Sequence, residues 1–326
     1  MDTTDHASPG GADFDIVIRG GTVFDGTGAP GRRADVGIRA GTIAAVSPTP
    51  LPVSAATRVI EAEGRWVTPG FVDTHTHYDV ELLVSPGLGE SVRHGVTTVL
   101  VGNCSLSGVY SGAVDVADLF SRVEALPRDA VVEALERTKS WSDPAAWRRA
   151  VEGLPLGPNV ASFLGHSDVR AAVMGLGRAT DPGHSPSRDE LREIERRVDE
   201  ALDAGFLGVS TMTNPWDKMD GDRYRSRTLP STHASWKEFR HISRILRRRD
   251  RVLQGVPNLN TKVDVAFYVA TSTGLLRKPL RVSLLSAADT LAEPWVNRVF
   301  RPLAWIANTL GRGRFVWQHL PTTFKV

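Results

Sequence analysis

Residues 69–79 read Pro-Gly-Phe-Val-Asp-Thr-His-Thr-His-Tyr-Asp. The Pro-Gly pair marks the start of a strand, and Phe71 and Val72 are predicted to lie in a core. Because side chains alternate along a strand, His75 and His77 are expected to point to one face. Imidazole is a common zinc ligand, and two imidazoles on one strand supply two coordination positions at little cost in loop closure. The segment therefore predicts part of a metal site; the alternative is a surface strand with two polar residues.

Downstream of this segment, short apolar runs alternate with helical patterns. The runs at 96–101, 160–164 and 206–210 are nearly continuous in apolar residues, as in parallel strands that are buried on both faces. Between the last two runs, Ser187 and Glu190 form a capping box that opens a helix. The alternation predicts an α/β fold, a (β/α)8-type TIM barrel.

In such barrels the chemistry lies at the carboxyl ends of the strands. The first strand ends in His75 and His77, the second in Cys104 and the third in His166, and a less regular fifth strand leads to His233. A thiolate near imidazoles favours zinc ligation, while the alternative for a lone cysteine is a small buried hydrophobe. His166 is expected either to contact substrate or to cap its loop.

Before residue 66, the pattern of apolar residues is different. Residues 1–12 are predicted to be a disordered tail, and 13–65 to be a small antiparallel β subdomain, because apolar pairs alternate around Gly-rich breaks and the Ala40-Gly41 turn. Another helix is expected to begin at Ser235, with Glu238 completing a second capping box. Residues 66–326 are assigned to the barrel.

Composition argues against a nucleic-acid-binding, a disulfide-rich or a membrane-spanning protein. The 326 residues are 41% hydrophobic and 23% charged with a net charge of +2, which is ordinary for a soluble protein and demands no nucleic acid. The basic run 244–251 is expected to be the solvated face of an amphipathic helix. One cysteine excludes an intramolecular disulfide framework. The polar amino terminus and the lack of a long apolar stretch predict a cytoplasmic protein without a membrane span.

Three segments carry a resemblance to a known family. They are the opening Asp15-Ile-Val-Ile-Arg-Gly-Gly-Thr-Val23, the stretch 69–77 quoted above, and His94-Gly-Val-Thr-Thr-Val99 with Gly102-Asn-Cys104. Together they resemble the amidohydrolase superfamily and, more narrowly, the N-acyl-D-amino-acid deacylases (D-aminoacylases). Residues 165–175 extend the match.

The resemblance implies hydrolysis of the amide bond of N-acyl-D-amino acids by a water that one or two zinc ions activate. It implies a metal site at His75, His77, Cys104 and His233, with a small N-acyl amino acid as the partner molecule. The related cyclic amidases bridge their metals with a modified lysine on the fourth strand. This chain has Val209-Ser-Thr-Met212 there, which favours the cysteine branch.

The sequence also departs from this family. The presumed sixth strand, Val252-Leu-Gln-Gly-Val256, carries Gln254 where a histidine ligand is expected, and no aspartate matches the general base of the eighth strand. Asp289 is a weak candidate for that base, because an aspartate that opens a loop or helix is more often a cap. We expect the chain to be a fragment of a longer enzyme; the alternatives are a short paralogue or an inactive protein that keeps the scaffold.

Overall fold

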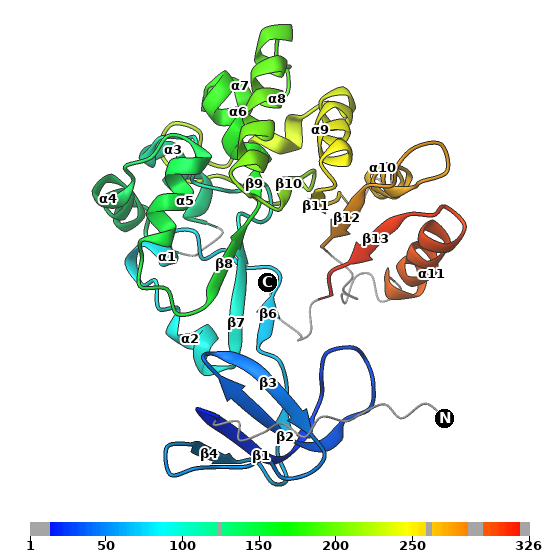
Figure 1. Ribbon diagram of the computed structural model, residues 1–326. Coiled ribbons are helices and arrows are strands. Elements are labelled where there is room, and N and C mark those ends of the chain that lie inside the picture. The colour runs from blue at the N-terminus through cyan, green and yellow to red at the C-terminus, as the bar shows by residue number, and fades with distance from the viewer. Residues whose placement is uncertain (1–13, 123–125, 259–262, 286–295, 320–326) are drawn as a thin grey trace. The chain divides into compact units, whose positions relative to one another are not determined.

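The computed structural model describes residues 14–122, 126–258, 263–285 and 296–319. The chain divides into two compact units, residues 1–71 and 72–326 (Figure 1). Asp289 lies outside the described residues. In the part of the chain that is described, no helix combines the length and the apolar character needed to span a membrane.

The first unit is a five-stranded mixed sheet. Its strands are β1 (Ile16–Val23), β2 (Arg32–Arg39), β3 (Thr42–Ser47), β4 (Arg58–Glu61) and β5 (Trp66–Val67). β2 pairs antiparallel with β1 and β3, while β4 and β5 run parallel to β1. The Gly20-Gly21 break is a bulge inside β1, where the backbone N–H of Gly20 donates to Asp35 at 2.8 Å. The sheet is thus not purely antiparallel, and β5 extends the unit beyond residue 65.

The second unit alternates parallel strands with helices, as Figure 1 shows. Its strands are β6 (Phe71–Asp73), β7 (Val96–Val101), β8 (Asn159–Ser162), β9 (Leu164–Gly165), β10 (Gly208–Met212), β11 (Val252–Val256), β12 (Arg281–Leu284) and β13 (Arg314–Trp317). Its helices are α1 (Glu81–Val84), α2 (Gly89–Arg93), α3 (Ala113–Phe120), α4 (Arg128–Thr138), α5 (Pro144–Glu152), α6 (His166–Met174), α7 (Leu176–Ala179), α8 (Arg188–Asp203), η1 (Pro230–His233, a 3-10 turn), α9 (Trp236–Arg248), α10 (Val263–Ser272) and α11 (Val296–Thr309).

The strands follow one another in chain order across two sheets, β6-β7-β8 and β9-β10-β11-β12-β13. Phe163 separates β8 from β9, so one broken strand serves both sheets: the N–H of Phe163 donates to Val101 at 3.0 Å, and the N–H of Leu207 donates to Ser162 at 2.9 Å. Strands in sequential order with helical crossovers are the arrangement of a (β/α) barrel. The predicted α/β class is confirmed.

One face of the larger sheet packs against helices α8 to α10. Leu253, Val282 and Phe315 of β11 to β13 share a buried cluster with Phe239 of α9 and Tyr268 of α10. Because side chains alternate along strands, the opposite face carries Gln254 and Ser283.

The predicted fifth strand at 229–233 is wrong. Pro230 opens the 3-10 turn η1, and the N–H of Thr232 donates to the carbonyl of Leu229 at 3.0 Å, three residues back. β11 pairs directly with β10, so Gln254 lies on the fifth strand in order and not on the sixth.

The prediction for the first strand is corrected in two respects. β6 ends at Asp73, before the histidines. Phe71 and Val72 are 57% and 54% exposed instead of lying in a core. β6 lies at the end of its sheet, so among the described residues β7 alone flanks it, and its apolar side chains lack the cover that a central strand receives.

Candidate metal centre

The two histidines lie in an extended segment beyond β6. Thr76 between them is buried, and both its N–H and its hydroxyl donate to the carbonyl of Leu100, at 3.2 Å and 2.7 Å. This anchoring keeps the alternation of a strand, so His75 and His77 both point away from Leu100, and their ring centroids are 5.4 Å apart. The predicted juxtaposition is present although the strand itself has ended.

Cys104 lies in an unusual loop after β7. Gly102, Cys104 and Ser105 have φ angles of 74°, 52° and 73°, in the left-handed region that side chains disfavour. A Cβ on Gly102 would collide with the carbonyl oxygen of Phe163, so only glycine fits there. Asn103 holds the loop to the first strand, because its Nδ2 donates to Leu100 at 2.7 Å and to Thr76 at 3.1 Å. The turn aims the thiol at the histidines.

The three side chains converge. The ligand atoms of His75, His77 and Cys104 all lie within 4.8 Å of one another, and Nε2 of His75 is 3.0 Å from Sγ of Cys104. Burial lowers the pKa of His75, although hydrogen bonding to Gln318 acts the other way. Burial, together with the nearby His75, lowers the pKa of His77 to about 3. Both imidazoles are therefore neutral at pH 7 and keep lone pairs available for a metal.

The pKa of the Cys104 thiol shifts in the opposite direction. Burial, followed by the negative charges of Asp217 and Asp79, raises the pKa of Cys104. The metal-free thiol consequently keeps its proton, and its Sγ lies 3.0 Å from Nε2 of His75. A metal cation at this position would compensate the buried thiolate, since the cation's charge inverts the local electrostatic preference.

The residues present fit a zinc ion. Two neutral imidazoles and one cysteine are the nitrogen and sulfur donors that zinc prefers. In addition, Nδ1 of His77 is buried without a hydrogen-bond partner among the described residues, and buried polar atoms are rarely left so.

A buried carboxylate supports the loop that follows Cys104. Asp168, at the start of α6, accepts the backbone N–H groups of Val109, Tyr110 and Ser111 at 2.8, 3.1 and 2.8 Å, and the hydroxyl of Ser107 at 2.7 Å. It is fully buried. Asp168 therefore ties the whole 107–111 segment to the start of α6.

His166 is not in the cluster. It is 1% exposed, its Nδ1 is 3.0 Å from the hydroxyl of Thr211, and its Nε2 is 2.7 Å from Glu238, which also pairs with the buried Arg170. Both ring nitrogens thus have protein partners, which favours a structural role. Binding of substrate by His166 stays a prediction.

His233 is not brought to the cluster either. It lies in η1, its Nε2 is 2.7 Å from the hydroxyl of Thr228, and it lines a surface pocket with Asp181 and Lys218. Among the described residues, the group with metal-ligand geometry contains His75, His77 and Cys104 but not His233. Because the segment at 229–233 is a turn and not a barrel strand, the reasoning that placed His233 at the rim no longer holds.

Three residues at or beside the site escaped prediction. Gln318 contacts His75, Asp168 supports the cysteine loop, and Glu238 bridges α9 and α6. Asp168 lies two residues after His166, just beyond the end of the third strand, which was a usable signal. Nothing in the local sequence distinguishes Gln318, which is 243 residues from His75.

Comparison with known proteins identifies a family and several relatives of this chain. Residues 58–223 match the Amidohydrolase family. An uncharacterized protein of Mycobacterium tuberculosis is 48% identical over 315 residues, which are 96% of this chain and 52% of that protein. The N-acyl-D-glutamate deacylase of Alcaligenes xylosoxydans xylosoxydans is 40% identical over 200 residues, 61% of this chain and 37% of the enzyme. The chain spans about half the length of the mycobacterial relative.

A solved structure extends the match to the fold. The N-acyl-D-glutamate deacylase from Bordetella bronchiseptica, complexed with zinc and a phosphonate inhibitor that mimics the tetrahedral intermediate, superimposes with a TM-score of 0.74 at 26% identity, over 95% of this chain and 59% of that one. The predicted TIM-barrel architecture is confirmed. The chain is thus similar to the N-acyl-D-amino-acid deacylases, and since the family match covers more than half of it, the protein belongs to the amidohydrolase family.

Proposed function

We propose that the protein hydrolyses the amide bond of N-acyl-D-amino acids at a zinc centre held by His75, His77 and Cys104, and that it acts in the cytoplasm. The observation that supports this most directly is the convergence of three ligand atoms within 4.8 Å. The deacylase relatives support the substrate class, and the zinc in the Bordetella enzyme supports the metal.

The chain's own residues prepare the site in three ways. His75 and His77 are neutral and need lose no proton before they bind. The thiol of Cys104 is the group that gives up a proton, and the left-handed loop fixes its direction. When bound, zinc supplies a water of lowered pKa and polarises the amide carbonyl. Hydrolysis then yields a carboxylate and the free amine of the amino acid.

A test combines metal content with turnover. The purified chain is loaded with zinc, metal is measured by mass spectrometry, and release of D-amino acid is followed with N-acetyl derivatives of D-glutamate, D-aspartate and D-methionine and their L-isomers. We expect bound zinc, activity on D-isomers, and loss of both in the double variant His75→Ala/Cys104→Ala. The matched control is His94→Ala, because the His94 side chain is 70% exposed. Absence of zinc from the wild-type chain would refute the proposal.

One observation favours a second candidate, an inactive member of the family that retains the scaffold. Among the described residues, the three-ligand group includes no carboxylate that could act as a general base. The inward-facing positions of the fifth and sixth strands carry Gln254 and Ser283, and neither is a histidine that could bind a metal. The same assay separates the two candidates: stoichiometric zinc without turnover on any D-isomer identifies the inactive form.

A further inference from the structure

A series of hydrogen bonds links His75 to residues on or just after the last three strands, β11 to β13. Nδ1 of His75 is 2.8 Å from Oε1 of Gln318, which follows β13, and Nε2 of Gln318 donates to the hydroxyl of Ser283 on β12 at 3.0 Å. Gln254 on β11 also approaches, with its Nε2 3.5 Å from the same Nδ1. Two glutamines thus approach one imidazole, and Ser283 holds one of them.

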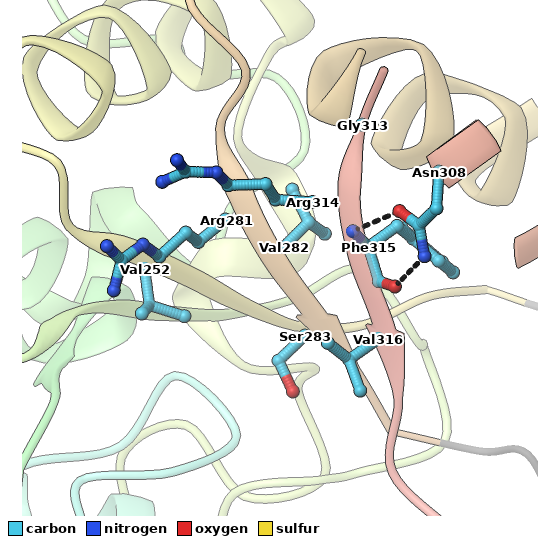
Figure 2. A pocket seen from close by; sticks show the side chains of 9 residues that line it. All are labelled: Val252, Arg281, Val282, Ser283, Asn308, Gly313, Arg314, Phe315 and Val316. Carbon is cyan, nitrogen blue, oxygen red and sulfur yellow. Dashed lines mark hydrogen bonds between the residues drawn. The ribbon is translucent and has the colours of Figure 1, made fainter. Parts of the chain in front are cut away.

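Ser283 lies at the edge of a cavity of about 600 Å³ over β11 to β13. Figure 2 shows Ser283 and Val316 projecting from neighbouring strands on the side away from Asn308. At the other end of the cavity, Arg281 and Arg314 pair with Asp250 at 2.7 Å and 3.2 Å, so its cationic groups already have partners. The serine is therefore the polar group through which this surface connects to the metal centre.

The orientation of the Gln318 amide favours one position for the ring proton of His75. With Nε2 of Gln318 directed to Ser283, the amide oxygen faces His75, and an amide oxygen only accepts hydrogen bonds. Nδ1 of His75 must then carry the ring proton, which leaves the lone pair on Nε2, the atom 3.0 Å from Cys104. The alternative, acceptance by Nδ1 from Gln254 at 3.5 Å, is at the limit of hydrogen bonding and is the weaker contact.

We propose that Gln318, oriented by Ser283, is the positioning residue of His75: it holds the Nδ1–H tautomer and the ring direction that turn Nε2 toward Cys104 and a zinc ion. This inference rests on the proposed zinc centre for its effect on metal binding, but the tautomer itself is a property of the metal-free protein. A partner on the outer nitrogen of a ligating histidine fixes its tautomer and raises its basicity.

The test compares four proteins: wild type, Gln318→Leu, Gln318→Glu and Gln254→Leu. Long-range nitrogen-15 NMR of the metal-free proteins reports which ring nitrogen of His75 carries the proton, with the signal assigned by its loss in His75→Ala. Zinc affinity is measured by competition with a chromophoric chelator. Gln254→Leu is the matched comparison, since it removes the same residue type, at a longer distance from the same ring nitrogen.

We expect the Nδ1–H form in wild type and a mixture in Gln318→Leu, with zinc bound about 10 to 100 times more weakly by that variant. Gln318→Glu keeps an acceptor and should retain both the tautomer and the affinity, a rescue that mere filling of space does not explain. Gln254→Leu removes only the longer contact to Nδ1, so it should keep the wild-type tautomer and weaken zinc binding less than Gln318→Leu does.

Three results overturn the inference: a dominant Nε2–H form in wild type, undiminished zinc affinity in Gln318→Leu, or a failure of Gln318→Glu to restore either property. If Gln318→Leu does not fold, wild type and Gln318→Glu still decide the tautomer. If wild type binds no zinc, the proposed function fails, whereas the NMR result still tests the role of Gln318.

Discussion

At the scale of single residues, the candidate metal centre depends on the left-handed backbone around Cys104 as well as on the types of its side chains. His75, His77 and Cys104 are readable from the sequence because histidine spacing and a lone cysteine after an apolar run are local patterns, and the structure brings the three together. Their role as ligands stays a prediction until metal is measured. The role of Gln318 could not be predicted from a local pattern, because its contact with His75 joins residues 243 positions apart.

The first prediction concerns the left-handed turn. Gly102→Ala places a Cβ against the carbonyl of Phe163 at a φ of 74°, so we expect a loss of at least about 2 kcal/mol in the free energy of unfolding, together with weaker zinc binding. Urea denaturation measures the former. At Gly89, the first residue of α2, a Cβ meets nothing within 4 Å, so Gly89→Ala serves as the control and should not destabilise the protein.

At the scale of elements, the same capping-box pattern has different outcomes at the starts of α8 and α9. Ser187 and Glu190 form the predicted capping box of α8 in both directions. At α9, Ser235 accepts the N–H of Glu238 at 3.3 Å, but the Glu238 carboxylate turns to His166 and Arg170 on α6. The pattern is the same in both helices, and the buried partners, which only tertiary packing supplies, decide the difference.

Glu238 predicts a dependence of stability on pH. Burial raises its pKa, but hydrogen bonds and charges from His166 and Arg170 outweigh burial, so the pKa in the folded state lies below the ordinary 4.5. A carboxylate with a lowered pKa stabilises the fold above its ordinary pKa, and this contribution is lost as pH falls through the lowered value.

We therefore expect acid unfolding of wild type below about pH 4.5 to include a step that Glu238→Gln lacks. At pH 7 the variant should lose about 3 to 5 kcal/mol, because it leaves Arg170 buried without its counter-charge. Unfolding free energies from denaturant titrations between pH 3 and pH 7 give both quantities. A parallel pH dependence of the two proteins would contradict the assignment.

Asp168 carries the next prediction at this scale. Asp168→Asn removes a charged acceptor of three backbone N–H groups and introduces an amide N–H into their cluster. The expected cost is about 3 kcal/mol of unfolding free energy, with faster hydrogen exchange at residues 109–111. Asp189→Asn is the control, since the Asp189 side chain is 84% exposed and its ion pair with Arg192 contributes little. Unchanged exchange in Asp168→Asn would count against this role.

At the scale of the molecule, strand order was predictable and strand count was not. Alternating apolar runs and helices are local signals, and they give the parallel α/β architecture. The fifth strand was misplaced because the 229–233 segment, which ends in a histidine, was counted as a strand, so that β11 was taken for the sixth. Gln254 on the fifth strand, Ser283 on the sixth and Gln318, just after the seventh, all contribute to one hydrogen-bonded group around His75.

Zinc should therefore stabilise the fold of the whole second unit, because its ligands come from the ends of two strands. At a free zinc concentration 100 times the dissociation constant, we expect a gain of about 2.7 kcal/mol in unfolding free energy. Thermal unfolding with zinc and with a chelator measures this gain. His75→Ala/His77→Ala should show no shift, and an equal shift in that variant would place the binding elsewhere.

Cys104 is the single cysteine of the chain, is 5% exposed and keeps its thiol proton in the metal-free protein. Alkylation by iodoacetamide under native conditions consequently requires the 102–111 loop to open first, and no other thiol contributes to the signal. The labelling rate of this one sulfur, followed by mass spectrometry, reports how often the loop opens, and it should fall when zinc is added and rise in Gly102→Ala and Asp168→Asn.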